Sequence, residues 1–295
     1  MADLDWTGER LVTSLSNLHG TIEHLHRYAL AIKLTKGKKV LDIACGEGYG
    51  SNLLAKEATW VTGVDISEEA VLHAGQKYIK DNLVFKSGST SAIPLKDNSV
   101  DVVVSFETLE HHDEHDEMMV EINRVLTPGG LLIISSPEKS IYKSRDPENP
   151  YHIKELTLLE FSTLLERYFS NVEMLEQKFV IGSLISSSGN QGRFRFLDGD
   201  FDGITDDIEC DEFYNRPFFN LALASNEEVP TNTGVSLFNG LRVLKNEQSL
   251  FTREKANMRK VADIQIEALK KSNSYTFGHA MLKPLSILKR IMGKQ

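Results

Sequence analysis

The stretch 40–50, Val-Leu-Asp-Ile-Ala-Cys-Gly-Glu-Gly-Tyr-Gly, constrains the fold more than any other part of the chain. Its first half is apolar and predicts a buried parallel strand over Lys39–Ala44. Its second half is a glycine-rich turn that opens a helix near Tyr49. Because glycines let the backbone approach a ligand and a helix N-terminus offers unpaired N–H groups, this turn predicts a ligand-binding loop.

A carboxylate stands at the end of the next predicted strand, Trp60–Asp65. An acid at that position, about 20 residues after the loop, suits a bidentate hydrogen bond to a ribose diol. The spacing fits both a nicotinamide-dinucleotide fold and an S-adenosylmethionine fold. The turn Cys45–Gly50 does not have the spacing of the three-glycine pyrophosphate fingerprint, which favours the second alternative.

Later motifs follow in a fixed order. Three more strands are predicted, at Leu83–Lys86, Ser99–Phe106 and Leu131–Ser136. Gly88-Ser89 follows the first of them, Glu107-Thr-Leu-Glu-His-His112 follows the second, and Leu126-Thr-Pro-Gly-Gly130 precedes the third. Over roughly residues 38–180, this set resembles class I S-adenosylmethionine-dependent methyltransferases.

The alternation of strands and helices predicts an α/β fold with a doubly wound, Rossmann-like sheet and right-handed crossovers. Further strands at Val172–Val180 and Pro217–Ser225 bring the sheet to seven, and we expect these two to form an antiparallel hairpin around a polar insertion. A lid helix is predicted over Thr21–Leu34 and another helix over Glu155–Phe169. The predicted parts are an N-terminal segment with the lid (1–36), a methyltransferase domain (37–226, with the insertion at 182–216) and a basic helical tail (227–295).

The resemblance implies S-adenosylmethionine as cofactor and a set of residues that bind it, namely Arg27, Asp42, Gly46, Gly48, Asp65, Ile66, Ser89, Thr90 and Glu107. Gly46 and Gly48 would shape the cofactor loop, and Asp65 would bind the ribose. Ser89 stands where the family commonly has an aspartate. A hydroxyl or the backbone at Ser89 and Thr90 would therefore serve the adenine.

The other residues of this set would bind the methionine part of the cofactor. Glu107 would face it from the end of the fourth strand. Asp42 would order the loop or reach the methionine amine through water. Arg27 shares one helix face with His24 and Tyr28, and it would either pair with the methionine carboxylate or form a surface ion pair.

Two histidines are candidate general bases, because an imidazole accepts a proton near neutral pH. His111 follows the fourth strand, and His152 lies in the long loop after the fifth. Either can instead be a hydrogen-bonded structural residue, and Glu107 is the fallback. A hydroxyl acceptor needs such a base, whereas a phosphate acceptor does not.

Two acidic stretches suggest metal ions, yet we predict no metal. Helical spacing would bring His111 and His115 to one face, but methyl transfer from a sulfonium needs no Lewis acid, so a solvated helix start is favoured. Asp198–Gly203, with Glu209 at the twelfth position, satisfies the EF-hand loop pattern. No amphipathic helix pair flanks it, so an acidic surface loop is favoured over calcium.

Charge and cysteine content narrow the function classes. The net charge of −9 combines +7 over residues 251–295 with −16 over residues 1–250. An acidic body argues against a nucleic-acid groove, and the basic tail argues for a separate interaction. The two cysteines fit a reducing cytoplasm, and neither a signal peptide nor an 18-residue apolar run is found, so a cytoplasmic protein is expected.

The outer segments carry a second resemblance. Thr7–Val12, Glu23–Ala31 and Pro150–Leu156 are similar to segments of methyltransferases found beside surface-polysaccharide glycosyltransferases, and Ser274–Arg290 is similar to tails of O-antigen and capsule assembly proteins. This resemblance implies O-methylation of a sugar hydroxyl, or a phosphate, of a surface glycan or its precursor.

Alternatives stay open for both the function and the tail. The chain can instead be a methyltransferase of a diffusible small metabolite, or a non-catalytic scaffold that binds the cofactor. Residues 275–293 can attach it to a membrane surface or to an assembly enzyme, or they can pack on the body or in a homodimer.

Overall fold

A computed structural model describes Leu11, Thr13 and residues 18–145, 149–180, 198–199, 204–205, 217–231 and 236–271. The chain divides into two compact units, Met1–Phe238 and Asn239–Gln295. The first holds the sheet and the candidate site. The described part of the second is one long helix, and each unit is considered by itself.

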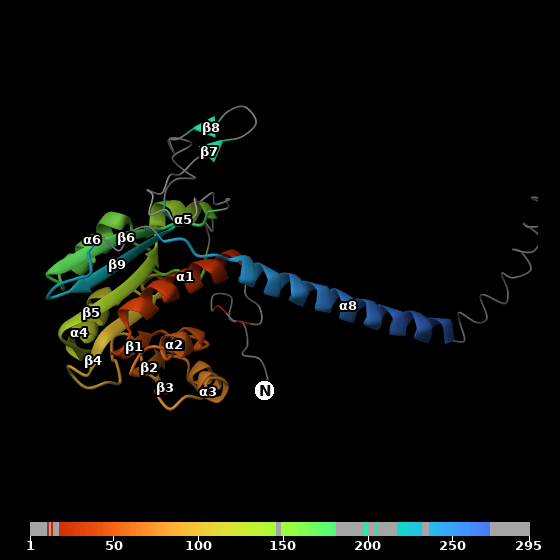
Figure 1. The fold of residues 1–295 in the computed structure, drawn as a ribbon, viewed down its shortest axis with the longest axis horizontal. Coiled ribbons are helices and arrows are strands. Elements are labelled where there is room, and N and C mark those ends of the chain that lie inside the picture. The colour runs from red at the N-terminus through yellow and green to blue at the C-terminus, as the bar shows by residue number, and fades with distance from the viewer. Residues whose placement is uncertain are drawn as a thin grey trace, which may run out of the picture. The chain divides into compact units, whose positions relative to one another are not determined.

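A seven-stranded sheet forms the centre of the first unit, in the order β3-β2-β1-β4-β5-β9-β6 (Figure 1). The strands are β1 (Lys39–Ile43), β2 (Trp60–Asp65), β3 (Leu83–Ser87), β4 (Val100–Phe106), β5 (Leu126–Pro137), β6 (Asn171–Gln177) and β9 (Phe219–Ser225). β1 to β5 pair in parallel, whereas β9 is antiparallel to both β5 and β6. The predicted doubly wound sheet and its closing antiparallel hairpin are confirmed.

Side chains alternate along the central strands between two hydrophobic clusters. Leu41 and Ile43 point into the first cluster, together with Met118, Ile122 and Phe161 from helices on that face. The opposite face carries the second cluster, whose members include Tyr28, Val40, Leu54, Val102 and Val104. Because both faces are covered, the strands read in the sequence as nearly continuous apolar runs.

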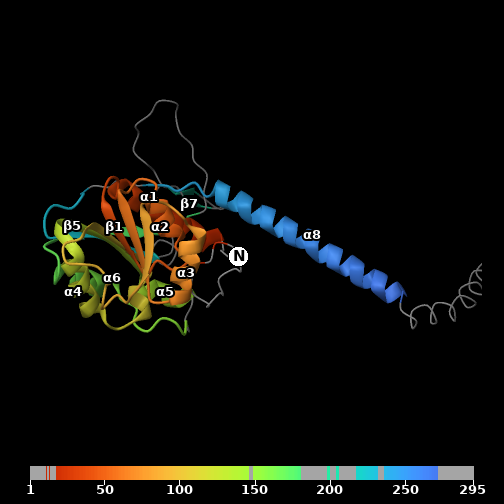
Figure 2. The ribbon, with the colours of Figure 1, turned by 90° about the horizontal axis from the view of Figure 1, so that it is seen from below.

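The helices cover the sheet in two layers (Figures 1 and 2). On one side lie α1 (Leu18–Leu34), α2 (Tyr49–Leu54) and α3 (Glu68–Lys77). The other side carries α4 (His115–Val125) and α6 (Leu158–Glu166), and the short elements η1 (Leu109–His111) and α5 (Lys139–Arg145) follow β4 and β5. This layering leaves the carboxyl ends of β1, β2 and β4 at one edge of the sheet, where doubly wound folds bind ligands.

Several element boundaries differ from prediction, among them the end of β6 at Gln177 rather than Val180 and the start of β9 at Phe219 rather than Pro217. The lid helix begins at Leu18 rather than Thr21. β5 begins at Leu126 because this residue pairs with Val100 before a register shift in the pairing with β4. α6 begins only at Leu158 because Thr157 and Glu160 form a reciprocal capping box there.

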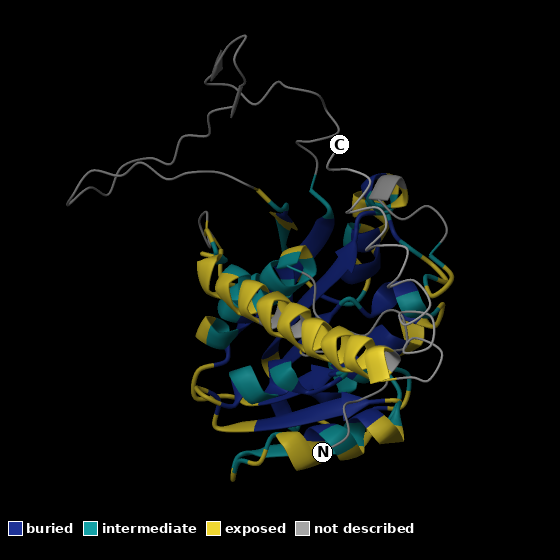
Figure 3. Cartoon of the chain, turned by 90° about the vertical axis from the view of Figure 1, so that its right-hand side faces the viewer, coloured by how far each residue is buried: buried dark blue, intermediate teal, exposed yellow. Residues whose placement is uncertain are grey.

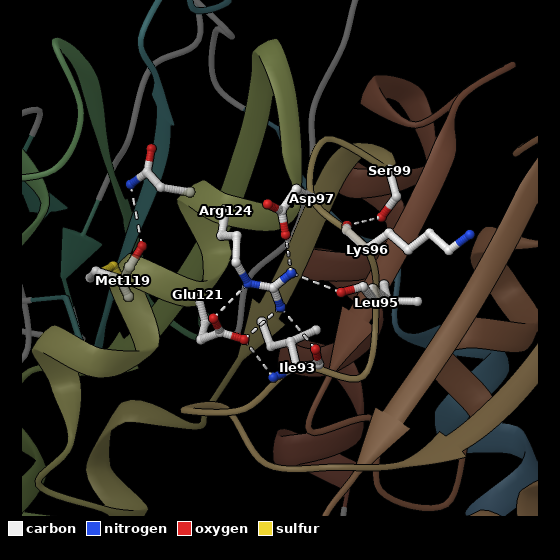
Figure 4. A network of polar contacts seen from close by, with 9 residues as sticks. Ile93, Leu95, Lys96, Asp97, Ser99, Met119, Glu121 and Arg124 are labelled. Atoms are coloured by element: carbon white, nitrogen blue, oxygen red, sulfur yellow. Dashed lines mark hydrogen bonds and ion pairs between the residues drawn. The ribbon is translucent and has the colours of Figure 1, made fainter.

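Arg124 fixes α4 to the loop that precedes β4 (Figure 4). Its guanidinium donates to Glu121 Oε1 at 2.6 Å and to Asp97 Oδ1 at 2.7 Å. The same group donates to the carbonyl oxygens of Ile93 and Leu95. These contacts hold the loop 93–97 against the helix that lies under the sheet.

The second unit contributes α8 (Leu241–Lys271), on which most described side chains are exposed (Figure 3). Among the described residues, no helix is both long and apolar enough to cross a membrane. The predicted tail segment 275–293 lies outside the described residues. Of the EF-hand-like stretch, only β7 (Asp198–Gly199) and β8 (Ile204–Thr205) are described, and they pair with each other in antiparallel fashion.

Candidate functional site

Strained backbone marks the ends of two neighbouring strands. Ala44, directly after β1, has φ 58°, and Glu107, directly after β4, has φ 53°. Non-glycine residues rarely adopt this left-handed conformation, which costs on the order of 1–3 kcal/mol and clusters at functional sites. β1 and β4 are paired in the sheet, so both strained residues lie at the same carboxyl edge.

The glycine-rich loop depends on two left-handed glycines, Gly46 at φ 56° and Gly48 at φ 86°. Gly48 is the N-cap of α2. A Cβ added there would lie 2.7 Å from Ala74 Cβ and 2.8 Å from the Phe85 ring. Gly48 is therefore required both by its backbone angle and by the close packing of α3 and β3 behind the loop.

Asp65 ties this loop to the start of α3. Its Oδ2 accepts a hydrogen bond from Gly46 N at 2.8 Å, and its Oδ1 accepts one from Ser67 N at 2.9 Å. An ionised carboxylate has about four lone-pair sites, so an acid at this position can accept hydrogen bonds from ribose hydroxyls as well as from backbone N–H groups. The next residue, Ile66, is 77% exposed although it is apolar, and it offers a surface that a flat ring could cover.

Ser89 and Thr90 follow β3 at the same edge, because Asp65 pairs with Ser87 across the two strands. Ser89 Oγ lies 3.0 Å from Ser91 Oγ. The turn is held close to β2, since Gly88 N donates to the carbonyl of Asp65 at 3.0 Å. Ser89 and Thr90, which are predicted to contact the adenine, therefore lie near Asp65. Their role stays a prediction.

Asp42 lies fully buried inside β1, under the loop. It accepts hydrogen bonds from Ser51 Oγ at 2.6 Å and from Tyr28 Oη at 3.2 Å. Burial, with a smaller contribution from the charge of Asp65, raises the pKa of Asp42 to about 7, although the hydrogen bonds from Ser51 and Tyr28 act to lower it. Its carboxyl thus links α1 to the strand that carries the loop.

α1 packs over the glycine-rich loop through the side chains on the helix face that points toward the sheet. His24 Nδ1 lies 2.8 Å from Tyr49 Oη at the start of α2. Burial, with a smaller contribution from the charge of Arg27, lowers the pKa of His24 well below its usual value. Together with the Tyr28–Asp42 hydrogen bond, this contact fixes the predicted lid helix over the loop in the structure.

Arg27 is almost fully buried, at 1% exposure, so it forms no surface ion pair. Its Nη1 donates to Gln177 Oε1 at 2.7 Å, and its guanidinium lies 4.6 Å from the centre of the Phe219 ring. Nη2 lies 3.9 Å from Glu107 Oε1. Within the described part of the chain, Nε and Nη2 of Arg27 have no hydrogen-bond partner, which is costly for a buried cation.

Glu107 is held from the side by β5. Ser135 Oγ donates to Glu107 Oε1 at 2.6 Å, and the Glu107 side chain keeps 14% of its surface exposed. The strained backbone of Glu107 and this hydrogen bond together direct the carboxylate toward Arg27. The predicted methionine-facing residues Arg27 and Glu107 are thereby brought together.

Sequence reasoning missed Glu47, which stands between the two loop glycines and is 1% exposed. Its Oε1 accepts hydrogen bonds from Lys77 Nζ at 2.7 Å and from the Thr13 hydroxyl at 3.1 Å, and its Oε2 accepts one from Thr13 N at 3.2 Å. The N-terminal segment is therefore fastened to the glycine loop at Thr13. The one sequence signal for this contact is an acidic residue inside a tight glycine turn. That signal does not predict which residue the acid binds.

The two candidate bases, His111 and His152, meet although 41 positions separate them. Their ring centres are 5.3 Å apart and their planes cross at 76°. The loop that carries His152 folds back onto η1, because Ile153 N and Lys154 N both donate to the carbonyl of Glu110. This folding places both imidazoles beyond the end of β4, and their role as bases stays a prediction.

The disfavoured alternative, in which His111 and His115 share one helix face, is not found, and the favoured solvated helix start is wrong for His115, which is only 3% exposed. The chain leaves helical geometry between η1 and α4, so the two residues do not share a helix face. His115 Nε2 lies 2.7 Å from the carbonyl oxygen of Leu109 and 2.8 Å from that of His112. His115 is a buried residue that ties the start of α4 to the preceding turn.

Comparison with known proteins agrees with this geometry. Residues 41–134 match the family model of a methyltransferase domain. A probable S-adenosylmethionine-dependent methyltransferase of Mycolicibacterium smegmatis is 36% identical over 173 residues, which cover 58% of this chain and 66% of that protein. A probable methyltransferase of the same description from Mycobacterium tuberculosis is 36% identical over 167 residues, covering 56% of this chain and 60% of that protein.

The fold has solved counterparts as well. A complex of the Haloferax volcanii Trm112 methyltransferase activator with a methyltransferase includes a similar chain, with a TM-score of 0.55, 20% identity, and coverage of 72% of this chain and 91% of that one. At this identity the likeness concerns the fold alone. The chain spans 60–66% of the length of the curated relatives reported above. Residues 41–134 thus match a methyltransferase-domain model, and the sheet around them has the Rossmann-like fold of this solved chain.

Proposed function

We propose that the chain is an S-adenosylmethionine-dependent methyltransferase. The observation that carries this proposal is the convergence of a ribose-type acid, a left-handed glycine loop and an incompletely bonded, buried arginine at one edge of the sheet. Each matches a different part of one elongated cofactor. The family match over residues 41–134 and the curated relatives support the same activity.

The residues present fit this cofactor. Arg27 has two buried nitrogens without a hydrogen-bond partner among the described residues, and a carboxylate such as that of methionine would satisfy them. Asp65 would accept hydrogen bonds from the ribose hydroxyls, while Ile66 would pack on the adenine. Ser89 and Thr90 would contact the adenine edge. S-adenosylmethionine supplies an electrophilic methyl group on its sulfonium, so the protein needs no oxyanion hole.

Glu107 and Asp42 serve the charged amine end of the same cofactor in this proposal. Glu107 lies 3.9 Å from Arg27 Nη2, so this part of the site offers one cationic and one anionic group side by side. A zwitterionic amino acid presents the matching pair of charges. Gly46 and Gly48 let the loop backbone pass close to the ligand, where a side chain would clash.

The acceptor we propose is a hydroxyl, and O-methylation is the reaction. Support comes from the two imidazoles that meet beyond β4, because removal of a hydroxyl proton calls for a group of this kind. The resemblance of the outer segments to glycan-modifying methyltransferases makes a sugar of a surface glycan or its precursor our first candidate. A phosphate acceptor would need neither His111 nor His152.

The location and partners follow from the charge pattern in this proposal. The basic, apolar segment 275–293 would bring the enzyme to the inner face of a membrane or to a membrane-bound assembly enzyme. A homodimer through the tail is the competing arrangement. The acidic body, with −16 over residues 1–250, is a poor partner for nucleic acid.

Turnover with isotopically labelled cofactor tests the proposal. Purified protein is incubated with labelled S-adenosylmethionine and glycan extracted from a strain that lacks the gene. We expect label in the glycan and an equal amount of demethylated cofactor, located by mass spectrometry. Label in a small-molecule fraction instead would assign the metabolite alternative, and cofactor binding without any turnover would favour the scaffold.

A further inference from the structure

Three side chains near the end of β4 form a cluster outside the set of residues proposed to bind the cofactor. Glu110, His111 and His152 each offer one ligand atom, and these atoms all lie within 4.8 Å of one another. The exposed fractions of the side chains are 1% for Glu110, 33% for His111 and 5% for His152, so the cluster is walled by protein and open on one side. Within the described part of the chain, this is the one group of three such residues.

Both imidazoles are oriented by their other ring nitrogen. His152 Nδ1 lies 2.7 Å from Glu155 Oε1, and His111 Nδ1 lies 3.1 Å from the carbonyl oxygen of Tyr151. An oxygen acceptor at Nδ1 fixes the proton there and leaves Nε2 with a lone pair. Histidines that ligate metals almost always donate their second N–H to a carboxylate or a carbonyl in this way.

We propose that Glu110, His111 and His152 bind a divalent first-row metal ion of the Zn²⁺ type. Two imidazoles and one carboxylate are a ligand set typical of zinc and related ions, with positions left for an exogenous oxygen. Ligands about 2.1 Å from a shared ion lie about 3–4 Å apart. The His111 Nε2 to Glu110 Oε1 separation is 3.9 Å and all three ligand atoms lie within 4.8 Å of one another, so a bound ion would draw these atoms closer together.

The role of the ion rests on the proposed function, whereas its binding does not. Methyl transfer needs no Lewis acid at the sulfonium, but a hydroxyl acceptor must still lose its proton. A metal ion lowers the pKa of an oxygen that coordinates it by several units. A coordinated acceptor hydroxyl would release its proton to water and become the nucleophile, and His111 and His152 would then act as ligands rather than as bases.

Calorimetric titration of the full-length, chelator-treated protein with Zn²⁺ tests the site, and Co²⁺ serves as a spectroscopic probe. We expect one equivalent of zinc to bind, and Co²⁺ to give visible absorption bands. Glu110→Gln and His152→Ala should each weaken zinc binding at least 100-fold. Glu155→Gln, which changes only the partner of His152, should weaken it by about 10–100-fold.

Two matched variants separate this proposal from the cofactor site. His19→Ala removes an exposed histidine on α1 and should leave zinc affinity unchanged. Asp65→Ala should weaken S-adenosylmethionine binding and leave zinc affinity unchanged, whereas Glu110→Gln should weaken zinc binding and leave S-adenosylmethionine affinity unchanged. Retained cofactor binding and an unchanged circular dichroism spectrum show that the Glu110 and His152 variants are folded.

The contrary results are equally definite. Zinc affinity that persists in both Glu110→Gln and His152→Ala would overturn the site, as would a wild-type protein that binds no zinc. Loss of zinc from His19→Ala alone would place the ion elsewhere. Zinc binding without any effect on turnover would overturn the assigned role of the ion but leave the site in place.

Discussion

At the scale of single residues, Asp65 combines a structural task with the proposed ligand contact. Asp65→Ala removes the two carboxylate oxygens that accept hydrogen bonds from Gly46 N and Ser67 N. The same oxygens are the proposed acceptors for the ribose hydroxyls. We expect cofactor affinity to fall by about 30–150-fold, equivalent to about 2–3 kcal/mol, by calorimetry. Ser67→Ala is the control, because it removes only the side-chain cap of α3. Wild-type affinity in Asp65→Ala would remove this acid from the site.

Arg27 lends itself to a test by ligand truncation. Arg27→Met keeps an unbranched apolar stem but removes the cation from the pocket beside Glu107 and Gln177. Affinity for S-adenosylmethionine should fall by about 10–100-fold, since hydrogen bonds to charged groups contribute about 1.5–3 kcal/mol. Affinity for methylthioadenosine, which lacks the carboxylate, should not change. Lys33→Met, at an exposed position of the same helix, should alter neither value. Equal losses for both ligands would mean that Arg27 only supports packing.

Asp42 makes stability depend on pH in an unusual direction for a carboxyl group. Its folded-state pKa of about 7 lies above the unfolded value of about 4, so the folded state holds the proton more tightly. Stability from this group is fully present below about pH 4 and is lost as the pH rises through about 7.

Asp42→Asn removes that dependence while keeping an oxygen for Ser51 and Tyr28. In urea denaturation, the variant should gain about 2 kcal/mol relative to wild type between about pH 5 and about pH 7.5. Asp81→Asn, at an exposed position, should show no such gain. A difference between Asp42→Asn and wild type that stays constant over this range would refute the raised pKa.

At the scale of elements, the packing of α3 and β3 against the loop can be measured with two glycines. Gly48→Ala adds a methyl group 2.7 Å from Ala74 Cβ at φ 86°, whereas Gly37→Ala adds one at φ 70° with nothing within 4 Å. Gly37→Ala should cost only the strain of the left-handed backbone, about 1–2 kcal/mol. Gly48→Ala should cost a further 1–3 kcal/mol, about the penalty for overpacking, as a lower urea midpoint. Equal urea midpoints for the two variants would show that α3 shifts to accommodate the added methyl group without loss of stability.

Elements with strong local signals were predictable. β2 was placed at Trp60–Asp65 and α2 at Tyr49, where the structure has them, because a buried apolar run and a glycine turn each leave little choice. The early start of β5 was not predictable, since Leu126 joins the strand only by pairing with Val100. Such long-range pairing leaves no periodic trace in the sequence.

Some residues of the candidate site could likewise be predicted from the sequence, and others could not. Asp65 and the loop glycines lie next to their strands, so their convergence follows from the parallel sheet alone. The meeting of His111 with His152 instead depends on two hydrogen bonds that fold the loop back onto the carbonyl of Glu110. The burial of Arg27 depends on Gln177 and Phe219, about 150 and 190 positions away. No motif links those positions.

At the scale of the whole molecule, the division after Phe238 separates the sheet with its candidate site from α8 and the residues beyond it. All residues proposed to hold the cofactor, and all three proposed metal ligands, belong to the first unit. The second unit contains the net positive stretch of the chain, +7 over residues 251–295. In our proposal, the first unit thus carries out methyl transfer, and the second unit attaches the enzyme to a membrane surface or a partner protein.

Removal of the basic tail tests this division of labour. Residues 275–293 combine apolar side chains with Lys283, Lys289 and Arg290, a composition suited to an anionic membrane surface, although Pro284 would interrupt a helix there. Full-length protein should sediment with anionic liposomes, and a truncation after Ser274 should stay in the supernatant, with unchanged affinity for S-adenosylmethionine. Neutral liposomes are the control, because each basic residue near an anionic surface contributes about 1 kcal/mol and this attraction is lost without charge. Equal pelleting of both proteins would assign the tail to a protein contact, and a shift from dimer to monomer on truncation would identify that contact as a second copy of the chain.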